Sequence, residues 1–310
     1  MLKNLPLLLF IIFSMSISCN GIVHAHESVD GSHPQVHVIP ATIEKNIVQI
    51  VEDGAYRYIR SNGIPNHRTG QFPNQNNPNA ISEQNYEYRV SINPLMTGQP
   101  KEQRGVIGVA VNGIPIEPGT AECYGRTRGQ RGPMSGCEWR EEAIINGNGQ
   151  LGLDNNNAHV QPTGAYHYHG VPYGLLGVLS ARCDRVHVGY AADGFRILVS
   201  MSDAYKSSYR LKSGNRPDGP GGRYDGTYTA DFLFIEGSGN LDQCNGAIIG
   251  GEYVYFMTKE FPFAPRCLMG LADASFSRHG LPAMGQGNQG LDRQNGSGFP
   301  QDGRPPPRPF

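Results

Sequence analysis

The segment NAHVQPTGAYHYHG, residues 157–170, alternates histidine with tyrosine beyond a Pro-Thr-Gly turn. Successive side chains along a β-strand point to opposite faces, so His167 and His169 are expected on one face. Tyr166 and Tyr168 are expected on the other face. The segment therefore predicts a β-hairpin with a histidine face and a tyrosine face.

The length of the turn decides which face His159 joins. The residues QPTG, 161–164, suit a three-residue loop, because proline fits the first central position of a type I turn and glycine the left-handed position after it. This loop places His159 directly opposite His167, and paired residues share a face. A two- or four-residue loop would shift the register by one residue and move His159 to the tyrosine face.

Three histidines on one face form a candidate metal site. Three imidazole ligands with one open position are typical of catalytic zinc sites, and copper binds the same ligands. We therefore predict that His159, His167 and His169 bind zinc or copper. The alternative is that they are polar strand residues bonded to backbone and water.

The N-terminus has the features of a secretory signal peptide over residues 1–25. Lys3 precedes an apolar run, and small residues lead to the expected cleavage after Ala25. This run is short for a membrane span, and no later segment approaches the roughly 20 apolar residues that a span needs. We expect a secreted or periplasmic protein with no transmembrane segment. Ordinary cleavage is favoured over lipoprotein anchoring through Cys19, because Ser16 is a poor start for a lipobox.

Five cysteines would remain after this cleavage. In an oxidising compartment they predict two disulfides with one cysteine left over. We predict the pairs Cys123–Cys137 and Cys244–Cys267. Cys183 is then the odd cysteine, and we expect it to be buried as a small apolar residue.

The composition favours strands joined by turns. The chain holds 41 Gly and 23 Pro residues, and long helical periodicity is hard to find. The formal net charge is -1 and the basic residues are scattered, so we expect no nucleic-acid partner. The prediction is an all-β fold, either a sandwich or a barrel-like pair of sheets.

Two pairs of similar stretches indicate an internal duplication. Residues 108–116 and 189–197 each place an Asn-Gly or Asp-Gly turn between apolar flanks. Residues 153–168 and 241–255 follow in the same order, and each leads from Leu-Asp through Asn to a Tyr-x-Tyr strand. This repetition predicts two pseudosymmetric halves.

The repeated stretches indicate where the domain begins and ends. The duplicated halves span about residues 105–170 and 186–258 of a β domain at 46–270. Residues 26–45 are expected to form a flexible lead-in, and 271–310 a disordered tail rich in Gly and Pro. In the second half, Val254 and Phe256 stand where the first half has histidines, so this kind of strand does not require them.

The run YHYH at 166–169 resembles the motif of the YHYH-domain proteins, the family named after it. Further blocks that resemble this family are SNGIPNH (61–67), QFPN (71–74), NPN (77–79), VNGIP (111–115), ADGF (192–195), YDGT (224–227), LDQCNG (241–246) and the stretch 261–270. The resemblance covers most of residues 55–270 and implies an exported domain. It implies no particular reaction, because the family has no established activity.

Two further polar residues can contact the site or its ligands, and a third is expected to lie elsewhere. His67 lies in a predicted loop that can approach the site, and Asp154 can accept a hydrogen bond from a metal-bound imidazole. His187 is expected to be a hydrogen-bonded core histidine.

Three classes of function remain open. The preferred one is an exported metal-binding protein which, if catalytic, activates water for attack on a small or extracellular substrate. The second is a non-enzymatic module that binds carbohydrate or another envelope polymer, and it requires Tyr166 and Tyr168 to be exposed. The third is a structural extracellular domain, in which the imidazoles lie apart or are fully bonded to backbone.

Overall fold

The computed structural model describes residues 45–126, 137–179, 184–202 and 204–277. The predicted signal peptide, almost all of the lead-in, most of the tail, Cys19 and Cys183 lie outside these residues. The predictions made for them therefore stay predictions.

Strands joined by turns make up most of the described chain, which confirms the all-β class. The strands are β1 (Val48–Asp53), β2 (Tyr56–Ser61), β3 (Tyr86–Ser91), β4 (Lys101–Glu102), β5 (Gly108–Ala110), β6 (Pro115–Ile116), β7 (Ile144–Ile145), β8 (Asn148–Gly149), β9 (Ala158–Val160), β10 (Tyr166–Tyr168), β11 (Arg185–Ala191), β12 (Arg196–Ser200), β13 (Tyr209–Leu211), β14 (Phe232–Phe234), β15 (Gly246–Ile249), β16 (Glu252–Met257) and β17 (Cys267–Leu268). The helical elements are α1 (Tyr173–Val178) and the 3₁₀ turns η1 (Thr229–Asp231) and η2 (Ala274–Ser277).

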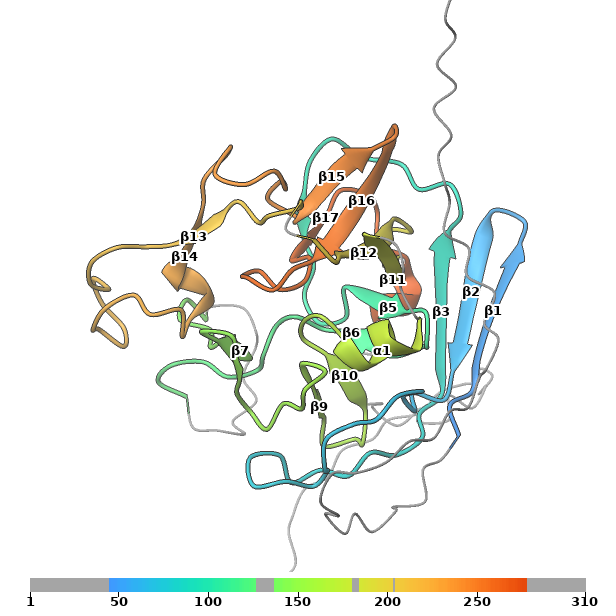
Figure 1. Cartoon of the computed structure of the whole chain (residues 1–310), viewed down its shortest axis with the longest axis horizontal. Coiled ribbons are helices and arrows are strands. Elements are labelled where there is room, and N and C mark those ends of the chain that lie inside the picture. Colours follow the sequence, from blue (N-terminus) through green and yellow to red (C-terminus); the bar gives the residue numbers. More distant parts are fainter. Residues whose placement is uncertain (1–44, 127–136, 180–183, 203, 278–310) are drawn as a thin grey trace, which may run out of the picture. The chain divides into compact units, whose positions relative to one another are not determined.

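The largest sheet contains eight strands in the order β15-β16-β12-β11-β5-β6-β10-β9 (Figure 1). Its middle is the antiparallel pair of β5 and β11. On one side of this pair follow the antiparallel hairpin β5–β6, the parallel pair β6–β10 and the antiparallel hairpin β9–β10 at the edge. On the other side follow, in the same way, the hairpin β11–β12, the parallel pair β12–β16 and the hairpin β15–β16. The first half of the sheet (β5, β6, β9, β10) thus repeats the second half (β11, β12, β15, β16), and the predicted pseudosymmetry is present.

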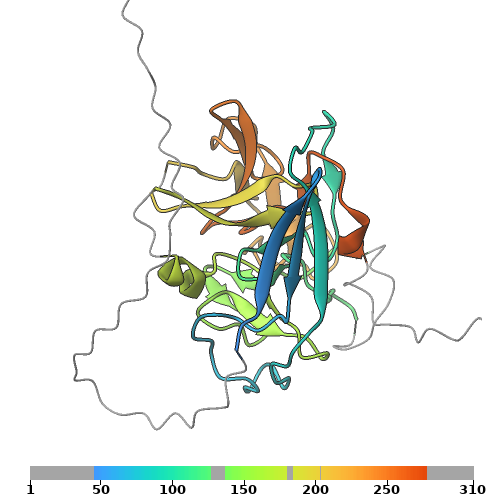
Figure 2. The same cartoon turned by 90° about the vertical axis from the view of Figure 1, so that its right-hand side faces the viewer.

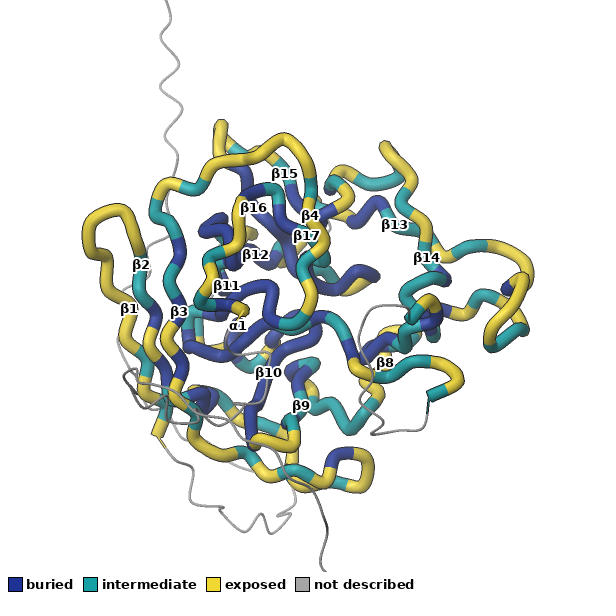
Figure 3. The backbone as a smooth tube through the Cα atoms, turned by 180° about the vertical axis from the view of Figure 1, so that it is seen from behind, coloured by how far each residue is buried: buried dark blue, intermediate teal, exposed yellow. Residues whose placement is uncertain are grey.

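A second sheet, with the strand order β1-β2-β3, packs through the same hydrophobic core (Figure 2). Ile59 and Tyr88 of this sheet belong to one buried cluster with Val109 and Tyr166 of the eight-stranded sheet. Figure 3 shows that β10 and most of β16 are buried while most of β1 is exposed. None of the sheets formed by the described residues closes on itself, so the sandwich alternative is realised and the barrel-like one is not.

Two disulfides form within the described residues. They join Cys123 to Cys137 and Cys244 to Cys267, which confirms both predicted pairs. Disulfides persist in oxidising compartments. The second bond connects β17 to the turn that precedes β15, and so holds a distant strand against the second half of the sheet.

The ordered domain continues beyond its predicted end at residue 270. Phe276 in η2 is 2% exposed and lies against Tyr88 of β3, with ring centroids 4.7 Å apart. Across the residues that the structure describes, no helix has the length and apolar character needed to cross a membrane.

Candidate metal centre

The hairpin of β9 and β10 has the predicted register. His159 pairs with His167. Gly164 has a φ of 84° and donates its N–H to the Gln161 carbonyl over 2.8 Å. The three-residue loop is therefore formed, with glycine in the left-handed conformation that such loops require.

The loop also contacts the segment that follows β2. The N–H of Ser82 donates to the Gly164 carbonyl over 3.0 Å. The side chains of Asn77 and Asn79 donate to the Val160 carbonyl over 2.9 Å and 2.8 Å. The position of the hairpin is thus fixed by its own turn and by a neighbouring segment.

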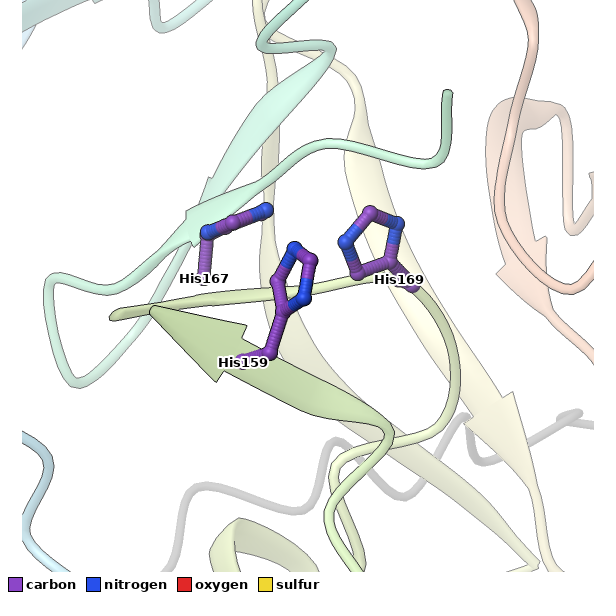
Figure 4. Close-up of side chains that lie close together, drawn as sticks. All are labelled: His159, His167 and His169. Carbon is purple, nitrogen blue, oxygen red and sulfur yellow. The ribbon is translucent and has the colours of Figure 1, made fainter. Parts of the chain in front are cut away.

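The three histidine rings form a nearly equilateral triangle (Figure 4). The ring centroids of His159 and His167 are 4.7 Å apart, those of His159 and His169 4.8 Å, and those of His167 and His169 4.7 Å. One ligand nitrogen from each ring lies within 4.8 Å of the others. The structure therefore brings together all three predicted residues.

The three ligand nitrogens lie farther apart than the nitrogens of a site that holds a metal ion. Nitrogens bound at about 2.0 to 2.1 Å in tetrahedral geometry lie about 3.3 Å from one another. The three nitrogens are separated by up to 4.8 Å, so binding one ion requires the rings to turn inward. Side-chain rotation without a change of backbone register can provide a movement of this size.

Backbone carbonyls orient two of the rings. Nδ1 of His159 lies 3.0 Å from the Leu151 carbonyl, and Nδ1 of His167 lies 3.3 Å from the Ala165 carbonyl. A carbonyl only accepts, so each Nδ1 carries the proton and each Nε2 keeps a lone pair. An N–H bonded to a carbonyl is the usual support of a metal-bound imidazole.

His169 differs from its two neighbours. Its side chain is buried, and neither ring nitrogen has a hydrogen-bond partner among the described residues. The Pro118 carbonyl is close enough to favour protonation but does not form a hydrogen bond of normal geometry. A buried polar group without a partner costs about 1 to 3 kcal/mol.

The electrostatic surroundings keep the three imidazoles neutral. Burial first and the neighbouring His167 second lower the pKa of His159 to about 4. Burial also lowers the pKa of His167 to about 4. Burial and then the other two rings hold the pKa of His169 well below its ordinary value. Neutral imidazole is the form that binds metal.

The tyrosine face is a packed and hydrogen-bonded surface. Tyr166 and Tyr168 are both 0% exposed, which contradicts the exposure that a carbohydrate-binding surface requires. The Tyr166 hydroxyl donates to Asp154 over 2.7 Å. The Tyr168 hydroxyl accepts from Asn112 over 2.9 Å and donates to Nε2 of His67 over 2.5 Å.

These contacts also locate the other predicted residues. His67 and Asp154 bond to the tyrosines, on the face opposite to the histidines, so the expectation that Asp154 bonds a site imidazole is wrong. Alternation along β10 explains this, because a partner of Tyr166 lies on the wrong side for His167. His187 bonds the Gly189 carbonyl over 2.9 Å, so the expected hydrogen bond is present, although the side chain is half-buried and does not lie in the core.

The second half of the sheet shows what the histidines replace. Ala247 pairs with Val254 on β15 and β16, as His159 pairs with His167 on β9 and β10. The main-chain N–H of His169 donates to Asn157 over 2.7 Å, and that of Phe256 donates to Asn245 over 2.8 Å. The equivalent positions, in order, are His159 and Ala247, His167 and Val254, and His169 and Phe256.

A carboxyl that the sequence reasoning missed lies near the histidine face. Glu117 and His167 line the same small pocket, and burial raises the pKa of Glu117 to about 7. The internal duplication could have pointed to this residue. Glu117 follows Ile116 at the position where the second half has Leu198 after Ile197, so a carboxyl stands where the second half has an apolar side chain.

Comparison with known proteins adds the family. Searches of curated proteins and of solved structures find no match to this chain. The family model described as YHYH protein matches residues 87–270, which is more than half of the chain and includes the YHYH run at 166–169. The chain belongs to the YHYH protein family.

Proposed function

We propose that this protein is an exported metal-binding protein in which His159, His167 and His169 hold one zinc or copper ion. The observation that carries the proposal is His169, whose two ring nitrogens are buried beside two other imidazoles and have no hydrogen-bond partner in the described part of the chain. An ion would satisfy that ring and make use of the two remaining Nε2 lone pairs. The disulfides and the predicted signal peptide support an oxidising compartment.

The structural alternative explains these residues less well. It requires the imidazoles to lie apart or to be fully bonded to backbone, whereas the rings are adjacent and His169 forms no hydrogen bond with any residue that the structure describes. The second half of the sheet forms the same strands with Ala247, Val254 and Phe256. Burying a side chain such as that of Val254 or Phe256 stabilises a fold by about 1.5 to 3 kcal/mol. Three polar rings in their place therefore favour a role other than stability.

The arrangement suits a small substrate. A three-imidazole site leaves one coordination position for water, and binding to the ion lowers the pKa of that water. His167 is 3% exposed and His169 2% exposed, so large molecules have little access to the ion. The reaction class that this supports is attack of activated water on a small molecule.

Titration with zinc and with copper(I) and copper(II), in competition with chromophoric chelators, tests the binding. We expect one ion per wild-type chain and loss of at least a hundredfold in affinity for His169→Phe, which copies Phe256. The matched control is His187→Gln, which changes a half-buried histidine bonded to Gly189 and should keep the wild-type affinity. No binding by the wild type, or equal binding by His169→Phe, contradicts the proposal.

A further inference from the structure

Strand β6 follows the Asn-Gly turn in the first half of the duplication. Glu117 comes directly after this strand, and its carboxyl lies near the candidate metal site. Ile116 pairs with Tyr168 in the parallel pair of β6 and β10, and the N–H of Glu117 donates to the Tyr168 carbonyl over 2.9 Å. Side chains alternate along a strand, so Glu117 points away from the face of Ile116 and Tyr168. That places Glu117 on the histidine face.

The second half of the sheet supports this placement. Leu198, the counterpart of Glu117, belongs to a buried apolar cluster with Val254 and Phe256, against which Ala247 and Ile249 pack. Asp154 in the first half is equivalent to Asp242 in the second. Counting forward from each, His159 is the counterpart of Ala247 and Gln161 is the counterpart of Ile249. Five members of one apolar cluster are thus replaced, in the first half, by His159, His167, His169, Glu117 and Gln161.

The carboxyl is held in a defined position. The Gln161 side chain donates to Oε2 of Glu117 over 2.8 Å. Glu117, Gln161 and His167 line one pocket of about 10 Å³, which has room for about one water molecule. Tyr86 and Tyr88 line the same pocket and close it on the side of β3.

Glu117 is not placed as a direct ligand. Among the described residues, the ligand atoms that lie within 4.8 Å of one another come from the three histidines alone. A water molecule in the shared pocket would lie beside both the carboxyl of Glu117 and His167, one of the three proposed ligands. Gln161 donates to Oε2, and within the described residues Oε1 of Glu117 accepts no hydrogen bond, so Oε1 is the oxygen placed to act on that water.

We infer that Glu117 is the proton acceptor for a water molecule bound at the three-histidine site. This inference rests on the proposed metal site. One O–H bond of the water breaks, its electron pair stays on the oxygen, and the proton forms a bond to Oε1 of Glu117. The oxygen then forms a bond to the carbonyl carbon of a small ester or similar carbonyl compound. The bond from that carbon to the leaving oxygen breaks, its electron pair stays on the leaving oxygen, and that oxygen takes the proton from Oε1 of Glu117. Gln161 acts as a positioning residue that keeps the carboxyl directed at the pocket.

Hydrolysis of 4-nitrophenyl acetate by the zinc-loaded full chain tests this role. We expect Glu117→Gln to bind zinc with wild-type stoichiometry while kcat/KM falls about a hundredfold, as is typical for loss of a general base. The acidic limb of the pH–rate profile should also disappear. The control is Glu252→Gln, which alters a carboxyl that pairs with Arg196 in the second half and should hydrolyse the ester at the wild-type rate.

The outcomes separate the two claims. Failure of the wild type to bind zinc overturns the metal site itself. If the wild type binds zinc but wild type and Glu117→Gln hydrolyse the ester at equal rates, only the role of Glu117 is overturned. The same holds if the zinc-binding wild type hydrolyses the ester no faster than His167→Ala does. Loss of zinc in Glu117→Gln makes Glu117 a ligand and also overturns the inference. Should Glu117→Gln fail to fold, Glu117→Leu, which copies Leu198, is held to the same criteria.

Discussion

His159 and His167 face each other across β9 and β10, with ring centroids 4.7 Å apart. The equivalent positions in the second half of the sheet hold Ala247 and Val254, which pair in the same way on β15 and β16. The same backbone arrangement is thus built with and without imidazoles. The pairing of these strands does not need histidine, and the second half serves as an internal reference for the first.

Replacing Gly164 should destabilise the hairpin and weaken metal binding. Gly164 has a φ of 84°, and a Cβ there would come within 1.8 Å of Ser82 Oγ. We expect Gly164→Ala to lower the free energy of unfolding by about 2 to 4 kcal/mol, which combines left-handed strain with the displacement of Ser82. Urea unfolding and zinc competition measure the two effects.

Gly54 provides the matched control for this substitution. Its φ is 60°, but no atom of the described residues lies within 4 Å of an added Cβ. Gly54→Ala should therefore cost only the backbone strain, about 1 to 2 kcal/mol, and leave zinc affinity unchanged. Equal losses in the two variants would show that contact with Ser82 does not matter.

The metal-free protein should lose stability in mild acid. The pKa values of His159, His167 and His187 are about 4 in the folded chain, each lowered chiefly by burial, against 6.5 for an ordinary histidine. Between these values the unfolded chain binds more protons, so the free energy of unfolding falls as the pH drops from 6.5 towards 4. Glu117, with its pKa raised to about 7, acts in the opposite direction, but one carboxyl does not cancel three imidazoles.

Urea unfolding at pH 7, 6 and 5 measures this dependence. His167→Val, which copies Val254, should reduce its slope, because one of the three imidazoles is removed. A metal-free wild type that is equally stable at pH 7 and pH 5 would show that these rings are not held neutral by the fold.

Removing the Tyr168 hydroxyl should affect stability and not metal binding. This hydroxyl bonds His67 and Asn112 on the face away from the site. We expect Tyr168→Phe to cost about 1 to 3 kcal/mol, since the buried Asn112 and the half-buried His67 each lose a hydrogen bond. Tyr255→Phe, which loses a 2.6 Å hydrogen bond to Asp193, should have a similar cost. Loss of zinc affinity in Tyr168→Phe would contradict the separation of the two faces.

Zinc should stabilise the wild type and leave His169→Phe unaffected. At a hundredfold excess over Kd, a ligand that binds only the folded chain raises the free energy of unfolding by about 2.7 kcal/mol. Without metal, the variant should equal or exceed the wild type in stability, because the two unbonded nitrogens of His169 are removed. Urea unfolding with and without zinc gives both quantities. Equal stabilisation of the two chains would remove His169 from the site.

The hairpin register could be predicted because its determinants are local. The turn residues at 161–164 fix the loop length, and alternation along β10 then places His167 and His169 with His159. The duplication was visible because each half repeats the same order of turn and strand. The equivalent tyrosines, Tyr168 and Tyr255, occupy matching places in the parallel pairs.

The rest of the site depends on contacts between distant segments. Glu117 comes beside His167 only because β6 pairs in parallel with β10, and no local pattern specifies that pairing. His67 reaches Tyr168 through the loop after β2, whose position depends on how the two sheets pack. The prediction for Asp154 failed for a local reason, since the equivalence of Asp154 with Asp242 beside Tyr253 already indicated a bond to tyrosine.

The metal-to-protein ratio of native protein tests the central claim most directly. Elemental analysis would compare the wild type with the triple variant His159→Ala/His167→Val/His169→Phe, which takes its residues from the second half. The account predicts about one zinc or copper ion per wild-type chain and none in the folded variant. Metal-free wild type from a zinc- and copper-replete culture, or the same metal content in both proteins, would contradict it.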